Sequence, residues 1–385
     1  MTQIDPLARP MFVAEIEQFG GAERSLLALS RWLFQQGLPN YLLTYHDACN
    51  IAQYATGPVP VVELKPARGA RAKIAALKSH CEARQPGAPA ILCSGYQPAL
   101  HATLAGMRSF HTLMHDTPSL FGDSGNRSLQ GKLRIALSNR IIGYGLRSGG
   151  RTLVNSEYLK AECRKDFGVE ADIVRMGGLQ NQSQRGTQNE SQRGTVERKK
   201  LGRLCMLSVC RVEANKRIDW LLLALAALEA NAVAPLSKPL SHVTDWRLDL
   251  AGKGSRIADL TALAASLGLS ERVHFHGFVP DDALEQMYGE ADLFLMPALQ
   301  GYGIPALEAL DRGIPVLLHR ESGVSDVLLD TPWATVMHGD EKETAEALAR
   351  AVNNQLCGLH LGVARPQLPS EDEWAAEVAR LCAWL

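Results

Sequence analysis

Short apolar runs alternate with stretches of helical periodicity along this 385-residue chain, and the whole series occurs twice. The first series begins with an apolar run at 12–16, followed by a helical pattern that Gly37 ends. The second series begins at 204–210 and continues to a helical pattern at 341–354. Strands that alternate with helices favour parallel pairing, with helices on both faces of the sheet. The sequence therefore predicts an α/β chain with two doubly wound, Rossmann-like domains.

A polar stretch at 181–200, NQSQRGTQNESQRGTVERKK, separates the two series. Its one aliphatic residue is Val196, so it cannot bury enough apolar area to offset the entropy lost on ordering. We interpret it as a mobile linker or loop extension between a domain at 1–180 and a domain at 201–365. The last residues, 366–385, carry an amphipathic pattern that predicts a final helix packed back on the first domain.

The composition excludes several classes of protein. With 46% hydrophobic and 21% charged residues the chain is in the globular range, and a net charge of -1 gives no field that attracts nucleic acid. No apolar run approaches the roughly 18 residues of a membrane span. The N-terminal sequence MTQIDPLARP lacks the apolar core of a signal peptide, and eight cysteines without a CxxC pair favour reduced thiols. We therefore expect a cytoplasmic protein that binds no nucleic acid.

Two glycine-containing segments connect a predicted strand to a predicted helix. Gly20 and Gly21 follow the first strand, and their free N–H groups at a helix start attract phosphate, although a tight turn alone explains them equally well. In the second domain, Gly301 and Gly303 precede a helix that contains Glu308. A carboxylate there can accept hydrogen bonds from both hydroxyls of a ribose. Alternatively, its negative charge complements the positive end of the helix dipole.

A pair of cations follows the first strand of the second domain. Arg211 and Lys216 stand where two fixed charges can hold a diphosphate and offset the charge that develops as a bond to it breaks. Solvated surface cations are the alternative interpretation. The adjacent acids Asp281 and Asp282 open a helix and are interpreted as helix caps, not as metal ligands.

A basic amphipathic pattern occupies the region between Lys65 and Arg84. Six Lys or Arg residues accompany Ile74, Leu77 and Cys81 at helical spacing. Such a helix can lie weakly on an anionic membrane leaflet, or it packs its apolar face on the first domain and solvates the other.

Seven motifs follow one another along the chain: Gly-Gly-Ala-Glu-Arg at 20–24, His115-Asp116, Asn155-Ser156-Glu157-Tyr158, Arg211 with Lys216, Gly252-Lys253-Gly254, Phe275-His276-Gly277-Phe278-Val279, and the segment from Gln300 to Glu308. Taken in this order, they resemble the motifs of GT-B glycosyltransferases, and most closely those of glycosyltransferase family 4.

The resemblance implies two Rossmann-like domains that face a central cleft, with the acceptor on the first domain and a nucleotide sugar on the second. It implies retaining transfer of a hexose-type sugar from a UDP- or GDP-linked donor to an acceptor hydroxyl, without a metal or other cofactor. The expected acceptor is a saccharide or a lipid-linked molecule, in polysaccharide, lipopolysaccharide or glycolipid biosynthesis. Such an enzyme would be cytoplasmic, with possible peripheral contact to the inner face of the inner membrane.

The resemblance also implies roles for individual residues. Arg211 and Lys216 would bind the diphosphate, Glu308 the ribose, and His115 a hydroxyl of the donor sugar, although a histidine at a strand end is often only structural. The implied catalytic residues are His115, Arg211, Lys216 and Glu308, and the implied donor-binding residues are Gly20, Gly21, Val279, Gln300, Gly301, Tyr302, Gly303, Ile304 and Glu308.

One position departs from the family pattern. Gln300 stands where the family has a glutamate that accepts hydrogen bonds from the donor sugar, and glutamine loses the charge while it gains a donor. The departure leaves open a nucleotide-sugar-binding protein without turnover, and the shared fold leaves open a sugar-nucleotide epimerase. It also predicts that Gln300 selects the donor sugar. Asp326, where the family usually has glutamate, is a conservative change.

Overall fold

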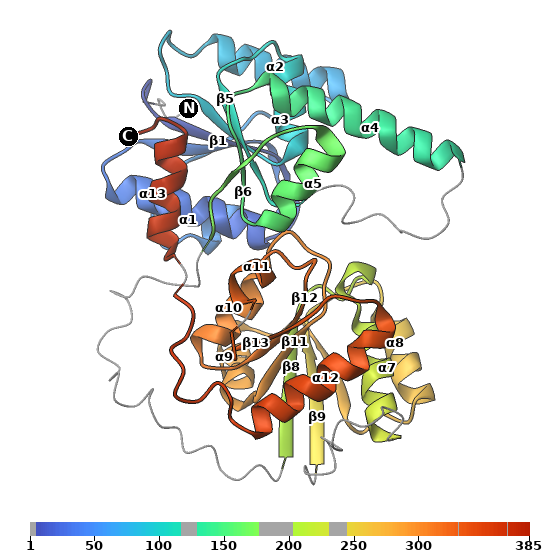
Figure 1. The fold of residues 1–385 in the computed structure, drawn as a ribbon. Coiled ribbons are helices and arrows are strands. Elements are labelled where there is room, and N and C mark those ends of the chain that lie inside the picture. Colours follow the sequence, from blue (N-terminus) through green and yellow to red (C-terminus); the bar gives the residue numbers. More distant parts are fainter. Residues whose placement is uncertain (1–4, 117–128, 177–202, 231–244, 330, 368) are drawn as a thin grey trace. The chain divides into compact units, whose positions relative to one another are not determined.

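The computed structural model describes residues 5–116, 129–176, 203–230, 245–329, 331–367 and 369–385 (Figure 1). The chain divides into two compact units, and the units are described separately. Unit 1 comprises Met1–Gly177 and Leu368–Leu385, and unit 2 comprises Gly178–Gln367. The predicted linker at 181–200 lies outside the described residues.

Unit 1 is built on a sheet of seven strands in the order β3-β2-β1-β4-β5-β6-β7, and every described pair is parallel. Its elements are β1 (Arg9–Ile16), α1 (Gly21–Gln35), β2 (Asn40–Asp47), a 3-10 turn (Ile51–Tyr54), β3 (Val61–Glu63), α2 (Ala70–Glu82), β4 (Ile91–Ser94), α3 (Tyr96–Leu104), β5 (Phe110–Met114), α4 (Leu129–Ser148), β6 (Thr152–Val154), α5 (Glu157–Phe167), β7 (Asp172–Ile173) and α13 (Glu371–Leu381). Since β1 pairs with β2 on one side and β4 on the other, the strand order reverses between β1 and β4. Ligands of open α/β sheets bind at such reversals.

The core of unit 1 forms because strands and helices both bury their apolar residues. Phe12 of β1 is fully buried, as are Leu26 and Leu33 of α1, whose apolar residues recur at helical spacing. Helix α2 buries Leu77 and packs Ile74 and Cys81 against the same core. The large apolar residues of the predicted basic helix therefore face the core, and contact of this helix with a membrane stays a prediction.

Helix α13 is the last helix of the chain and packs beside α1 (Figure 1). Its start is fixed by a capping box, in which Glu373 N–H donates to Ser370 Oγ at 3.1 Å and Ser370 N–H donates to Glu373 Oε2 at 2.7 Å. Arg31 of α1 pairs with Glu371 at 3.0 Å. Beyond the helix, the Trp384 indole is 2% exposed and its Nε1 donates to the carbonyl of Ala90 at 3.0 Å.

Unit 2 is built on a parallel sheet of six strands in the order β10-β9-β8-β11-β12-β13. Its elements are β8 (Arg203–Val209), a 3-10 turn (Ala214–Lys216), α7 (Ile218–Glu229), β9 (Asp245–Ala251), α8 (Ile257–Ser266), β10 (Val273–Gly277), α9 (Asp281–Glu290), β11 (Leu293–Met296), α10 (Ile304–Asp311), β12 (Val316–His319), α11 (Ser325–Leu328), β13 (Ala334–Met337) and α12 (Glu341–Leu356). The strand order reverses between β8 and β11. The predicted class, an α/β chain with two doubly wound sheets, is confirmed.

The glycines of the Gly252-Lys253-Gly254 motif allow two loops of unit 2 to touch. A Cβ atom at Gly252 would lie 1.8 Å from the carbonyl oxygen of Cys210, and one at Gly254 would lie 2.1 Å from that of Val212. Gly252 has a φ of +140°, which side chains rarely adopt. The motif therefore holds the segment that carries Arg211 directly against the end of β9.

We expect Trp384→Ala to destabilise unit 1 by about 3–5 kcal/mol, because it removes a buried indole and leaves a cavity. The free energy of unfolding is measured by urea denaturation with near-UV circular dichroism. Leu385→Ala is the matched control, since Leu385 is 70% exposed and should change stability little. Equal stability of the two variants would contradict the structural role of the C-terminal segment.

Candidate functional site

The predicted functional residues of unit 2 gather at the carboxyl edge of its sheet. Because all strands are parallel, the segments after β8, β10 and β11 emerge at one edge. Arg211 and Lys216 follow β8, Val279 follows β10, and the segment from Gln300 to Ile304 follows β11. The structure thus brings together residues that are separated by up to about a hundred positions in sequence.

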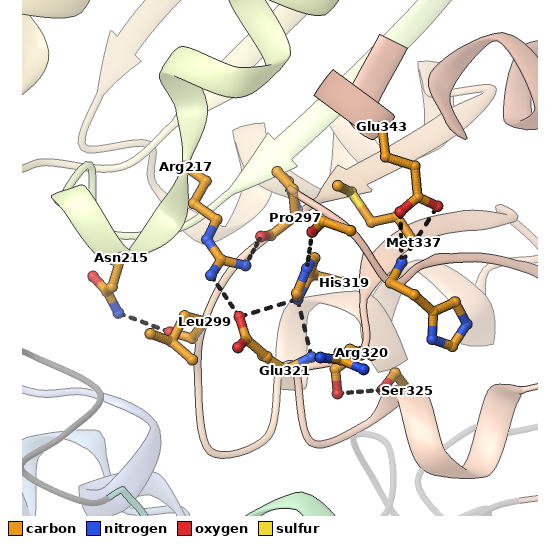
Figure 2. Close-up of polar contacts among 12 residues, drawn as sticks. Asn215, Arg217, Pro297, Leu299, His319, Arg320, Glu321, Ser325, Met337 and Glu343 are labelled. Carbon is orange, nitrogen blue, oxygen red and sulfur yellow. Dashed lines mark hydrogen bonds and ion pairs between the residues drawn. The ribbon is translucent and has the colours of Figure 1, made fainter. Parts of the chain in front are cut away.

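Lys216 and Gln300 form the central contact of this edge. The Lys216 ammonium donates to Gln300 Oε1 at 2.6 Å, although the residues are 84 positions apart. Asn215 joins the same two loops. Its side-chain Nδ2 donates to the backbone carbonyl of Leu299 at 3.0 Å (Figure 2), and its backbone carbonyl accepts from Leu299 N–H at 2.8 Å. The loops after β8 and β11 are therefore fixed to each other at the strand reversal.

Both the oxygen and the nitrogen of the Gln300 side-chain amide form hydrogen bonds within the protein. Its Nε2 donates to Met296 Sδ and to Ser322 Oγ, each at 3.0 Å, and the residue is 8% exposed. Its backbone N–H donates to the carbonyl of Glu321 at 3.1 Å. Gln300 thus links the Lys216 loop to the loop after β12, and its proposed contact with the donor sugar stays a prediction.

A second cluster, absent from the sequence prediction, supports these loops. Arg217 pairs with Glu321 (Figure 2). Its guanidinium lies 4.3 Å from the centre of the Trp220 ring. Arg217 has a φ of +54°, in the left-handed region, and is the residue at which the chain turns from Lys216 into α7. In the sequence, only the position of Arg217 next to Lys216 indicated that it belongs to the site. Its partner Glu321, in the loop after β12, could not be predicted from the spacing of residues along the chain.

His319 anchors the other end of this cluster. The ring is 2% exposed; its Nδ1 accepts from Glu321 N–H at 3.1 Å, and its Nε2 lies 2.9 Å from the carbonyl of Gly339 (Figure 2). This pair of contacts requires the neutral tautomer that carries its proton on Nε2. Burial lowers the pKa of His319, which favours the same neutral form.

Glu308 lies within α10 and is 9% exposed. Its Oε2 accepts from the Tyr288 hydroxyl at 2.8 Å. Burial, together with the Glu308 carboxylate, raises the pKa of Tyr288, so this hydroxyl remains a donor. Arg312 lies 4.7 Å from the centre of the Tyr288 ring and donates to the carbonyl of Glu308 at 2.8 Å. Tyr288 therefore orients the predicted ribose ligand, a role that nothing in the sequence indicated.

The loop between Gln300 and α10 depends on Gly303. Its φ is +125°, and a Cβ atom there would lie 2.5 Å from Gln300 Nε2. Gly301 and Tyr302 are buried, and the Tyr302 carbonyl accepts from Ser322 Oγ at 2.9 Å. Ile304 is the first residue of α10. This arrangement leads the chain directly into the N-terminus of α10, where backbone N–H groups favour anions.

Val279 follows β10 and is half-buried, while its neighbour Phe278 is 69% exposed. Lys253 lies above the Phe278 ring, 5.2 Å from its centre.

Asp281 and Asp282 occupy the first turn of α9. Among the described residues, no group of three or more His, Cys, Asp or Glu side chains is arranged to hold a metal ion.

The predicted residues of unit 1 gather at the carboxyl edge of its own sheet. Gly20 precedes α1 and Gly21 begins it, directly after β1. His115 follows β5, and its Nε2 lies 3.1 Å from the Oγ of Ser94, the last residue of β4. Burial lowers the pKa of His115 to about 4. The imidazole is therefore neutral at physiological pH and offers hydrogen bonds, not charge.

Two family models match, and together they cover both units. The model described as "Glycosyl transferases group 1" matches residues 192–358, and the model described as "Glycosyltransferase Family 4" matches residues 19–176. The chain belongs to the group 1 glycosyltransferases.

Curated relatives of this glycosyltransferase share part of their length with it. It is 26% identical over 244 residues to the GDP-mannose-dependent alpha-(1-6)-phosphatidylinositol monomannoside mannosyltransferase of Mycolicibacterium smegmatis, and the match spans 60% of each chain. It is 36% identical over 107 residues to the D-inositol 3-phosphate glycosyltransferase of Nocardia farcinica, which spans 27% of this chain and 24% of that one.

Solved structures confirm the GT-B fold. Sucrose-phosphate synthase from Thermosynechococcus elongatus aligns with a TM-score of 0.69 at 16% identity and covers 98% of both chains. Anabaena HepE in complex with UDP aligns with a TM-score of 0.68 at 16% identity, over 98% of this glycosyltransferase and 100% of HepE. WaaG, a glycosyltransferase involved in lipopolysaccharide biosynthesis, gives 0.63 at 18% identity, over 96% and 95% of the two chains.

We expect the NMR signals of the His115 ring to stay constant from about pH 6 to about pH 8 and to move only near pH 4, because burial favours the neutral ring. His115→Gln assigns the signals, and free histidine in the same tube is the reference. Because the folded pKa lies below the unfolded value of about 6.5, acid should destabilise the parent more than His115→Gln between about pH 6.5 and pH 4. A midpoint near pH 6.5 would contradict the burial of the ring.

Proposed function

We propose that this glycosyltransferase moves a hexose-type sugar from a UDP- or GDP-linked donor to an acceptor hydroxyl, with retention of configuration and without a metal ion. The observation that carries the proposal is the Lys216 ammonium, fixed at 2.6 Å from Gln300 at the strand reversal of unit 2. A cation held at this position can bind the diphosphate of the donor. It can then stabilise the negative charge that develops on the diphosphate as the bond to the sugar breaks. The names of HepE bound to UDP-glucose and of the GDP-mannose-dependent relative support a nucleotide-sugar donor.

The leaving diphosphate is the group that needs stabilisation in such a transfer. Arg211 is exposed and follows β8 five residues before Lys216, and α10 begins after β11, the strand beside β8. Two cations and a helix N-terminus offset the charge that grows on the phosphates as the bond to the sugar breaks. In our proposal these groups replace the divalent cation that other nucleotide enzymes use.

The remaining donor contacts are assigned to groups that the fold already orients. Glu308 accepts the ribose hydroxyls and is held in place by Tyr288. The backbone beside Val279 contacts the nucleobase, and the segment from Gly301 to Ile304 contacts the sugar and phosphates. On unit 1, the neutral His115 donates or accepts a hydrogen bond at a sugar hydroxyl, and Gly20 and Gly21 allow the substrates to approach the backbone.

For the acceptor we propose a saccharide or a lipid-linked molecule, so that the product enters polysaccharide, lipopolysaccharide or glycolipid biosynthesis in the cytoplasm. Relatives named for phosphatidylinositol monomannoside and for diacylglycerol support a lipid-linked acceptor. Among the described residues no helix is long and apolar enough to cross a membrane.

The test is incubation of the protein with UDP-glucose, UDP-galactose or GDP-mannose and short alkyl glycosides as acceptors. Released nucleoside diphosphate and the anomeric configuration of the product, measured by NMR, report transfer and retention. Binding without release would instead identify a nucleotide-sugar-binding protein. A new sugar nucleotide formed without an acceptor would identify an epimerase.

We expect Arg211→Ala and Lys216→Ala each to lower turnover by about 10²–10³, the scale for loss of one preorganised electrostatic contact. Arg203→Ala is the matched control, because Arg203 begins β8 at the opposite edge of the same sheet and is exposed. Turnover is measured with saturating donor, and thermal unfolding confirms that each variant folds. Full activity of either Arg211→Ala or Lys216→Ala would remove that cation from the mechanism.

Gln300→Glu distinguishes two roles for this residue. The sequence predicts that Gln300 selects the donor sugar, whereas its contacts with Lys216 and Ser322 favour a role in holding the cation. In the second role, a carboxylate at this position would form an ion pair with Lys216 that competes with the diphosphate, so affinity for UDP or GDP should fall about threefold to tenfold while preference among donor sugars is unchanged. Titration calorimetry measures the affinity, and Gln300→Met removes the amide without adding charge. Altered sugar preference with unchanged diphosphate affinity would show instead that Gln300 faces the sugar.

A further inference from the structure

Arg217 follows Lys216 in the chain, and the proposed function gives it no part. Its guanidinium pairs with Glu321 and donates from Nη1 to the carbonyl of Pro297 at 3.4 Å (Figure 2). The same group lies 4.3 Å from the centre of the Trp220 ring, and the side chain is 16% exposed. The charge of Arg217 is therefore committed to the protein and not presented to a phosphate.

The backbone of Arg217 is unusual for an arginine. Its φ is +54°, in the left-handed region, where a residue with a Cβ atom is strained and glycine is not. Its N–H donates to the carbonyl of Ala214 at 3.1 Å and closes the 3-10 turn that ends at Lys216. Glycine would make this turn more easily, so the arginine side chain must have a use there that glycine cannot serve.

Glu321 connects Arg217 to the loop of Gln300. Its carboxylate accepts from Arg217, and its backbone carbonyl accepts from Gln300 N–H at 3.1 Å. Its own N–H donates to Nδ1 of the buried His319 at 3.1 Å, which fixes the backbone of Glu321 against unit 2 (Figure 2). One residue of the loop after β12 thus holds both the turn after Lys216 and the loop after β11.

These contacts close a ring that begins and ends at Lys216. The Lys216 ammonium donates to Gln300 Oε1 at 2.6 Å, and Gln300 N–H donates to the carbonyl of Glu321. Glu321 pairs with Arg217, which follows Lys216 by one peptide bond. Breaking the pair opens the ring and lets the ammonium move relative to the loop after β11. A cation that is already in place stabilises a transition state better than one that must first be ordered.

We propose that Arg217 and Glu321 are positioning residues for Lys216. Their ion pair closes the ring and holds the Lys216 ammonium where the donor diphosphate binds, and neither residue contacts the substrate. The inference rests on the proposed function, which supplies the role of Lys216. It extends that function to the loop after β12, which acts through Lys216.

Arg272 provides a matched control within unit 2. Like Arg217, it pairs with a carboxylate and lies over an indole: its Nη1 donates to Asp245 at 3.1 Å, and its guanidinium lies 5.1 Å from the centre of the Trp246 ring. Asp245 begins β9 and Arg272 directly precedes β10, so this pair lies at the amino edge of the sheet. Arg272→Gln therefore removes the same two kinds of contact away from Lys216.

The experiment is a double-mutant cycle between positions 217 and 216. We expect Arg217→Gln and Arg217→Gly each to lower turnover about 10- to 100-fold in the parent, and less than about twofold in Lys216→Ala, where nothing is left to position. Arg217→Gly fits the left-handed turn, so an equal loss in both variants excludes a backbone effect. Arg272→Gln should turn over like the parent. Turnover is release of UDP or GDP with saturating donor and an alkyl glycoside, and thermal unfolding confirms folding.

Hydrogen exchange of residues 297–304, followed by mass spectrometry, reports the loop without reference to activity. We expect faster exchange in both Arg217 variants than in the parent. Full turnover of these variants, unchanged exchange, or an equal loss with and without Lys216 would overturn the inference, and the last result would make Arg217 a ligand in its own right. A parent that neither binds nor releases UDP or GDP would overturn the proposed function and this inference with it. An active parent with equally active Arg217 variants would overturn this inference alone.

Discussion

Parallel pairing is the constraint on which the rest of the structure depends. In each unit every described strand pair runs in the same direction, so every loop that follows a strand emerges at one edge. The strand order reverses between β1 and β4 and between β8 and β11, and ligands of open α/β sheets bind outside the carboxyl ends of the strands at such reversals. Parallel pairing and this strand order are sufficient to bring Lys216, Gln300 and Glu308 to the same edge of the sheet.

Hydrogen bonds between loops convert this edge into a defined arrangement. Lys216 is fixed through Gln300, Gln300 through Ser322, and the turn after Lys216 through the ion pair of Arg217 with Glu321. A cation held in this way loses little freedom when it meets a phosphate, which is the condition for strong electrostatic stabilisation of a transition state. The neutral, buried His319 supports the same loops without adding a charge that would compete for the phosphate.

Periodicity in the sequence predicted the two sheets, the two glycine loops and the placement of both cations, because each of these depends on neighbours along the chain. It did not predict the contact of Lys216 with Gln300, or that of Tyr288 with Glu308, because such pairs are set by how strands order themselves in the sheet. Helices α2 and α4 show a second limit. Both carry apolar residues at helical spacing, and only tertiary packing decides which of these residues are buried. The polar stretch at 181–200 lies outside the described residues, and its interpretation as a linker stays a prediction.

The return of the chain to unit 1 has a consequence for biosynthesis. Residues up to 177 leave the ribosome before unit 2, but unit 1 lacks α13 and the Trp384 anchor until residues 368–385 have followed all of unit 2. Unit 1 therefore begins before unit 2 but is completed after it. Until then the faces of α1 and β1 that α13 and Trp384 cover are exposed to other chains. A stop codon just before α13 would consequently damage unit 1, whose other residues lie almost two hundred positions earlier, while it leaves the sheet of unit 2 intact.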